Sequence, residues 1–137
     1  MIVRWLDRFP VAVCHLLFRL AIAGVFFRAG LTKLVSWETT VPLFRDEYKV
    51  PVFSPEVAAA LATAFELGCP ILLIAGLATR LATVPLLGMI AVIQLFVYPS
   101  AWPEHLTWTS ILLFLFTRGA GALSVDRVLG RGSSIPR

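Results

Sequence analysis

The sequence predicts an all-α membrane protein, built as an antiparallel bundle of four transmembrane helices. Two observations predict this class. First, 58% of the 137 residues are hydrophobic, 15% are charged and the mean hydropathy is +0.86, and a soluble domain of this size could not bury so much apolar surface. Second, the apolar residues fall into four runs joined by mostly short links, a pattern typical of helices that reverse direction at each link.

The four apolar runs give the expected helices of a single domain over residues 1–137. The first three have lengths of roughly 28 to 36 Å, enough to cross a hydrocarbon core about 30 Å thick. The fourth is shorter, and Pro103 followed by Glu104 suits its first turn. The predicted spans are 11–34, 56–77, 81–99 and 103–118, with an outer loop at 35–55 and a flexible tail at 131–137.

Basic residues lie mainly at the ends of the apolar runs. Seven fall in the N-terminal tail, the second link and the C-terminal segment, and three fall on the opposite side. The positive-inside rule therefore predicts both termini in the cytoplasm of a multi-pass bacterial inner-membrane protein, with the long loop in the periplasm. Because these basic residues form no patch interleaved with aromatics, we expect no nucleic-acid partner. Cleavage of a signal peptide after Ala23 would remove half of the first span, so none is expected.

Ionisable side chains inside the spans are the candidate functional groups, because a charge in a span is costly and needs a partner. On a helical wheel His15, Arg19 and Lys33 share one stripe of the first span, and Arg28 points away from it. Counting depth puts Arg19 roughly 12 Å and Glu66 roughly 16 Å from the cytoplasmic side, so the two are expected to pair. Lys33 is expected near the outer surface. The predicted polar cluster is His15, Arg19, Lys33, Glu66 and Gln94.

Two interpretations of the expected Arg19–Glu66 pair stay open. It is either a structural clasp between the first two spans or a polar site for a proton-coupled or quinone-type ligand. Gln94 either bonds a neighbouring helix or a quinone carbonyl. His15 is expected to be packed and hydrogen-bonded, because no second metal ligand lies at helical spacing from it. Arg28 is expected to snorkel outward, to contact the outer loop or to contact a partner subunit.

The two cysteines show no spacing that indicates a redox or metal site. Cys14 and Cys69 lie inside apolar runs, without a CxxC motif or a Cys/His pair. Their predicted heights differ by about five residues, which is too far for a disulfide. We therefore expect both to be packing residues, and we predict no metal site.

Several short motifs, in this order along the chain, resemble the DoxX family of small four-helix membrane proteins. The resemblance implies that the family's arginine, lysine and glutamate are Arg19, Lys33 and Glu66, and Arg28 departs from the family pattern. The motifs cover about residues 15–129 and are Arg19-Leu20, Gly24, Phe27, Gly30-Leu31, Lys33-Leu34, Glu66-Leu67, Gly76-Leu77-Ala78-Thr79-Arg80 and Arg118-Gly119-Ala120-Gly121-Ala122-Leu123-Ser124-Val125-Asp126.

A second set of residues resembles the DoxX branch that is encoded beside bufferin-type peptides and iron-dependent modifying enzymes, in operons for copper or other metal stress. This resemblance implies an inner-membrane subunit or accessory of a redox or metal-stress system. The residues are Trp37-Glu38-Thr39-Thr40, Phe44, Asp46-Glu47-Tyr48, Val50-Pro51, Val97-Tyr98-Pro99 and Trp102.

Two alternatives remain beside that function. One is a membrane subunit of a quinone-linked oxidoreductase of the thiosulfate:quinone type, and the other is a small-molecule transporter, for which four helices would have to dimerise. No bound cofactor is predicted, so a redox cofactor would be a diffusible quinone or belong to a partner. The expected partners are the lipid bilayer, a membrane or periplasmic protein and a second copy of the chain.

Overall fold

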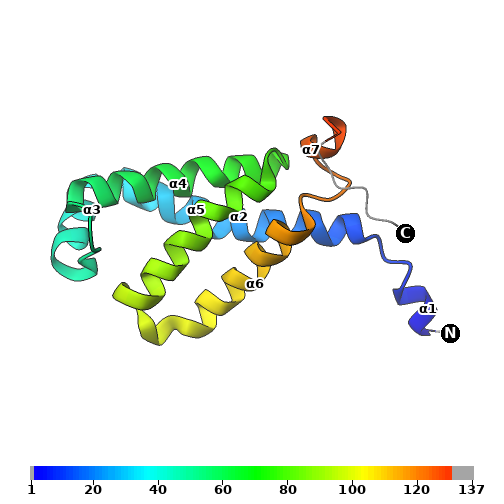
Figure 1. Cartoon of the computed structure of the whole chain (residues 1–137), viewed down its shortest axis with the longest axis horizontal. Helices are drawn as coiled ribbons and strands as arrows, with labels where there is room; N and C mark the ends of the chain where they lie inside the picture. Colours follow the sequence, from blue (N-terminus) through cyan, green and yellow to red (C-terminus); the bar gives the residue numbers. More distant parts are fainter. Residues whose placement is uncertain (1, 131–137) are drawn as a thin grey trace.

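A computed structural model describes residues 2–130, so the tail predicted at 131–137 lies outside the described residues. The described part is all-helical (Figure 1). Besides α-helices it contains two π-helices, η1 and η2, and one short 3₁₀ helix, η3. The elements are α1 (Ile2–Leu6), α2 (Val11–Val35), α3 (Trp37–Leu43), η1 (Phe44–Tyr48), α4 (Pro55–Ala75), α5 (Thr79–Val92), η2 (Ile93–Val97), η3 (Pro99–Ala101), α6 (Trp102–Arg118) and α7 (Val125–Val128).

Among the described residues, three helices are long and apolar enough to cross a membrane. They are α2, α4 and the continuous helix that α5 and η2 form over Thr79–Val97. Helix α6 is shorter, with 17 residues. Large apolar side chains stand exposed along the long helices, as expected of a surface that faces lipid. Examples are Leu17, Leu20, Leu31, Leu61, Ile71, Leu81 and Leu95.

Local signals explain where α4 begins and ends. The Ser54 hydroxyl accepts a hydrogen bond from the Val57 amide at 3.3 Å, and Pro55 takes the first helical position, a combination that favours a helix start. Gly76 ends the helix with φ +70°, a left-handed conformation that glycine adopts without strain. The observed bounds lie within two residues of the predicted span 56–77.

The segment 35–55 is not the simple polar loop that the sequence suggested. Helices α3 and η1 occupy most of it, which lets its backbone groups bond within the segment. The Thr40 hydroxyl donates to the carbonyl oxygens of Lys33, at 3.1 Å, and Ser36, at 3.0 Å. Phe44 is buried against Ala58 and Ala59 near the start of α4. The segment is therefore a packed part of the fold.

Helices α2, α4, α5 and α6 share one apolar core. Helix α4 runs along α2, and α5 and α6 slant away together (Figure 1). Gly30 permits the close approach of α2 and α4, because a Cβ there would lie 2.9 Å from Leu67 Cδ2. The buried core residues are Ile22, Ala23, Phe26, Cys69, Leu73, Ala82, Leu86, Ile90, Leu112 and Leu115.

The chain after α6 folds back onto the turn between α4 and α5. The Asp126 carboxylate accepts hydrogen bonds from the amides of Ala78, at 2.8 Å, and Thr79, at 3.1 Å. The Asp126 amide donates to the Gly76 carbonyl at 2.9 Å. The Arg19 guanidinium donates to the Leu123 carbonyl at 2.5 Å. These bonds join α2, the α4–α5 turn and residues 123–126 at the start of α7, and we call them the C-terminal closure.

Replacing Asp126 with Asn should weaken the C-terminal closure. Asparagine has one acceptor oxygen instead of two and no charge, so the free energy of unfolding should fall by about 1–2 kcal/mol. The melting temperature in detergent measures the effect. The exposed Asp7 is the matched control, and its change to Asn should stay within about 0.5 kcal/mol. Equal melting temperatures for D126N and wild type would contradict this role of Asp126.

Candidate functional site

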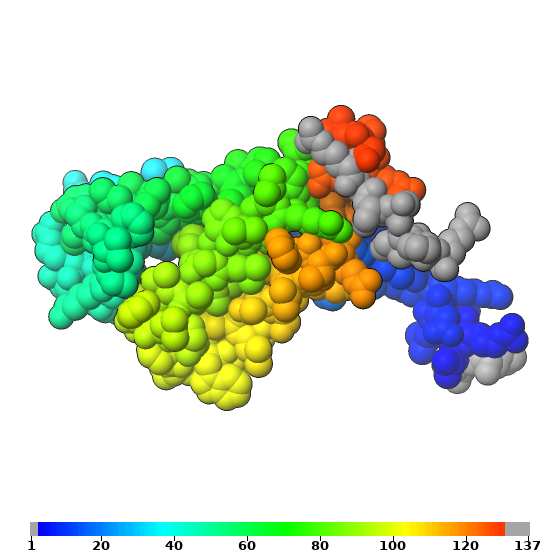
Figure 2. All heavy atoms as spheres, viewed as in Figure 1, coloured from blue at the N-terminus to red at the C-terminus, as the bar shows by residue number. Residues whose placement is uncertain are grey.

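A cavity of about 650 Å³ lies where α2, α4, α5, η2, α6 and η1 meet. Figure 2 shows the surface hollowed between the lobe that holds α3 and the far end of α5. Aromatic and aliphatic side chains make most of its wall, and the polar exceptions are few. The polar and charged side chains on the wall are Lys33, Tyr48, Glu66, Tyr98, Glu104 and His105.

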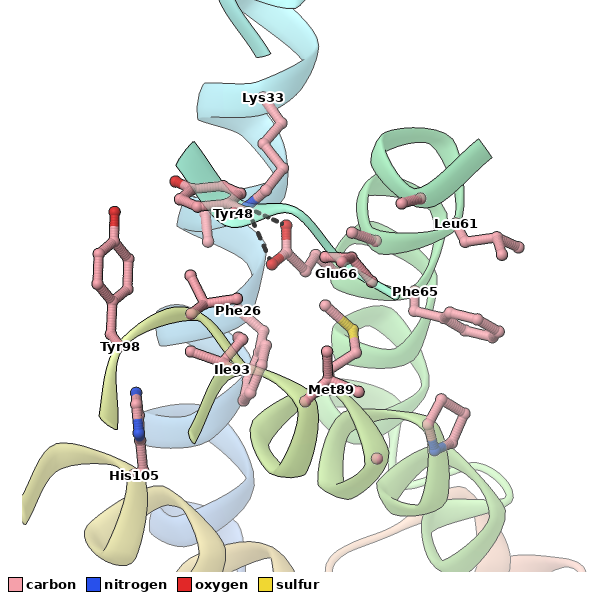
Figure 3. A pocket seen from close by; sticks show the side chains of 18 of the residues that line it. Phe26, Lys33, Tyr48, Leu61, Phe65, Glu66, Met89, Ile93, Tyr98 and His105 are labelled. Carbon is pink, nitrogen blue, oxygen red and sulfur yellow. Dashed lines mark hydrogen bonds and ion pairs between the residues drawn. The ribbon is translucent and has the colours of Figure 1, made fainter. Parts of the chain in front are cut away.

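An ion pair between Lys33 and Glu66 lies in the cavity wall. The Lys33 ammonium is 2.8 Å from one Glu66 carboxylate oxygen and donates a hydrogen bond to the other at 3.0 Å (Figure 3). The two side chains are 19% and 4% exposed. Because the two charges neutralise each other, both side chains can remain ionised among apolar side chains.

The expected Arg19–Glu66 pair is wrong. Arg19 lies against Gly76, at the end of α4, where a Cβ on that glycine would overlap its Nη1. The depth count assumed that the first residue of α2 and the last residue of α4 lie at the same level. Instead α2 extends about two turns beyond the α4–α5 turn, so Arg19 is level with Gly76 and Lys33 is the residue that reaches Glu66.

Arg19 belongs to the C-terminal closure and not to the cavity. It is 1% exposed, and its neighbouring charge is that of Asp126. Its Nε and Nη1 atoms have no hydrogen-bond partner among the described residues. Through its bond to Leu123 and its contact with Gly76, the guanidinium holds segments of the chain together at the end of the molecule away from the Lys33–Glu66 pair.

The remaining predicted polar residues are distributed over three places. His15 is 3% exposed and its Nδ1 bonds the Gly119 carbonyl at 3.1 Å, so it joins α2 to the residue that follows α6. On the stripe of α2 that was predicted to carry His15, Arg19 and Lys33, the first two are buried and Lys33 is partly buried, whereas Arg28 is exposed. Gln94 bonds His105 in α6 and is outside the set of described residues that line the cavity.

Tyrosines from the two π-helical regions meet at one edge of the cavity. The rings of Tyr48 and Tyr98 are 5.7 Å apart, edge to face. The Tyr98 hydroxyl donates a hydrogen bond to the Glu47 carboxylate, and this bond raises the pKa of the Tyr98 phenol. The bond therefore links η1 to Tyr98, the residue that follows η2.

His105 is a cavity residue that the sequence analysis missed. It is 5% exposed, in the first turns of α6, and its ring packs 5.6 Å from that of Trp108. Its Nδ1 bonds the Gln94 side-chain oxygen at 2.7 Å. A histidine near the polar start of a helix does not by itself indicate a functional site. The Gln94 amide in the neighbouring span did indicate that it has a hydrogen-bond partner.

The size and lining of the cavity suit a small, mostly apolar molecule. Pockets of 300–1,000 Å³ with apolar walls and a few placed polar groups are typical ligand sites. The ion pair supplies both a hydrogen-bond donor and an acceptor, and the aromatic walls can stack on a flat ring. Within residues 2–130 no group of three His, Cys, Asp or Glu side chains is placed to hold a metal ion. Cys14 and Cys69 are free thiols.

Double-mutant cycles should couple Glu66 to Lys33 and not to Arg19. Glu66→Gln leaves the ammonium unpaired, which should lower the free energy of unfolding by about 3 kcal/mol. Adding Lys33→Gln should then cost little more, whereas Arg19→Gln should add to Glu66→Gln within about 0.5 kcal/mol. Unfolding in mixed micelles, followed by circular dichroism, measures these values. A coupling between Arg19 and Glu66 above about 1 kcal/mol would contradict the observed pairing.

Comparison with known proteins gives one family. The DoxX family model matches residues 14–99, which is more than half of the chain. The matched part contains Arg19, Lys33 and Glu66. Searches of curated proteins and of solved structures found no match. Together with its membrane-type helices, the match identifies the chain as a multi-pass membrane protein that belongs to the DoxX family.

Proposed function

We propose that this DoxX-family protein binds a quinone-type molecule in the cavity, as a membrane subunit or accessory of a redox or metal-stress system. The observation that carries the proposal is an apolar, aromatic-walled cavity of about 650 Å³ that contains a buried ion pair, Lys33–Glu66. The resemblance to the DoxX family, which implies an association with thiosulfate:quinone oxidoreductase, supports a quinone-type ligand. The resemblance to the branch found beside bufferin-type peptides supports a copper or other metal-stress setting.

The proposed arrangement is a bundle of four membrane-spanning helices in the bacterial inner membrane, with α6 as the fourth span. At 17 residues α6 is about 25 Å long, and the η3 turn before it adds length. The contacts of Arg19 with Gly76 and of Lys33 with Glu66 support opposite directions for α2 and α4. The excess of basic residues near the chain ends supports cytoplasmic termini, with α3 and η1 on the periplasmic side.

A quinone fits the chemistry of the wall. Its flat ring can stack against Phe26 or Trp108, whose own rings are 5.9 Å apart. A ring oxygen can accept a hydrogen bond from the Lys33 ammonium, and a hydroxyl of the reduced form can donate to the Glu66 carboxylate. The apolar tail would follow the aliphatic wall of the cavity. A buried pair contributes little stability by itself, so ligand binding is a reason for the chain to have it.

Tryptophan fluorescence tests whether a quinone enters the cavity. Trp108 lines the cavity and is one of four tryptophans in the chain. Titrating decylubiquinone into protein in nanodiscs should quench the emission in a saturable way. Trp108→Phe should remove most of the saturable part, and the control Trp5→Phe, in the exposed helix α1, should keep it. Purely linear quenching that is equal in all three proteins would contradict binding.

Replacing the ion pair by apolar residues separates a binding role from a structural one. The double variant Lys33→Met/Glu66→Leu removes both charges and keeps similar volume, so it should fold with nearly unchanged or greater stability. It should nevertheless bind decylubiquinone about tenfold more weakly, because the hydrogen-bonding groups are gone. A stable double variant with wild-type affinity would show that the pair is only a structural clasp.

A further inference from the structure

His105 is a second polar point on the cavity wall, and Gln94 bonds it from outside the residues that line the cavity. His105 lies in α6, whereas Lys33 and Glu66 lie in α2 and α4. Figure 3 shows the His105 ring apart from the ion pair and below Tyr98. The ion pair is the polar group that the function proposed above uses, and this buried histidine has no role in it.

The hydrogen bonds around His105 define which ring nitrogen carries the proton. The Gln94 side-chain NH₂ donates to the Pro99 carbonyl at 3.0 Å, which leaves the Gln94 oxygen to face His105 Nδ1 at 2.7 Å. An amide turned the other way would bring two oxygens together at Pro99. Nδ1 is therefore the donor, and in the neutral ring Nε2 is a hydrogen-bond acceptor.

Aromatic rings connect the two polar points. Trp108 packs 5.6 Å from His105 and 5.9 Å from Phe26, ring centre to ring centre. Phe26 lies on the same stripe of α2 as Lys33. A flat molecule packed against Phe26 and Trp108 would therefore have one edge near the ion pair and another edge near His105. Such a molecule satisfies both points only if it has polar atoms on two edges.

We infer that His105 is a specificity-determining residue that accepts a hydrogen bond from a ring hydroxyl of the ligand. This inference rests on the proposed function and narrows its ligand to an aromatic diol, the reduced form of a quinone. A molecule with one polar end, such as a fatty acid, would leave His105 Nε2 buried without a partner, which is unfavourable. The site should therefore bind the quinol more tightly than its dimethyl ether, which has no hydroxyl to donate.

Competition against decylubiquinone in nanodiscs, under anaerobic conditions, tests the assignment. Wild-type protein should bind decylubiquinol about fivefold or more tightly than the dimethyl ether of the same quinol. His105→Phe keeps a ring in place without an acceptor, so it should reduce this ratio. The matched control is His15→Phe, which changes a buried histidine outside the cavity and should leave the ratio as in wild type.

The outcomes separate the two proposals. If wild-type protein binds neither the quinone nor the quinol, the proposed function is overturned, and the His105 assignment falls with it. If it binds the quinone but shows no preference for the quinol over the dimethyl ether, only the His105 assignment is overturned. This second result is obtained with wild-type protein alone, so the inference can still be overturned if the His105→Phe protein fails to fold. A preference that is as large in folded His105→Phe as in wild type also overturns it, because the part that remains through Glu66 should be smaller.

Discussion

The ion pair between Lys33 and Glu66 is the interaction on which the arrangement of α2 and α4 depends. A single charge inside a span is costly, so the two helices must align in the register that brings these side chains together. Helical side chains lean toward the N-terminus of their own helix, and in the proposed antiparallel arrangement the two therefore lean toward each other. Gly30 permits the short distance between the helices that this contact requires.

The two ends of the bundle have different packing, and the difference relates stability to function. At one end Asp126, Arg19 and His15 bond backbone groups and leave little free space. At the other end the helices separate around the cavity, and two π-helices lie beside it. Irregular helical turns of this kind often occur at functional sites. The C-terminal closure stabilises the bundle at the end where no ligand is proposed.

The sequence predicted the helices better than their contacts. Hydropathy and end signals are local, so the span ending near Gly76 was predicted to within two residues, and the buried stripe through Arg19 followed from helical periodicity. The partner of Glu66 depends on how far α2 extends beyond the α4–α5 turn, which no local pattern reveals. His105 was missed because its partner, Gln94, lies across a turn whose geometry was unknown. The helical content of residues 35–55 does not follow from the sequence, because a polar composition of this kind predicts a loop.

Photoaffinity labelling with an azido-quinone, on protein in nanodiscs and followed by peptide mapping, tests whether a quinone-type molecule occupies the cavity beside Lys33 and Glu66. Crosslinks are expected on cavity residues such as Met89 and Trp108, and they should be lost when an unlabelled short-tail quinone competes. Crosslinks confined to exposed, lipid-facing side chains such as Leu20 and Ile71, with no competition, would contradict this occupancy.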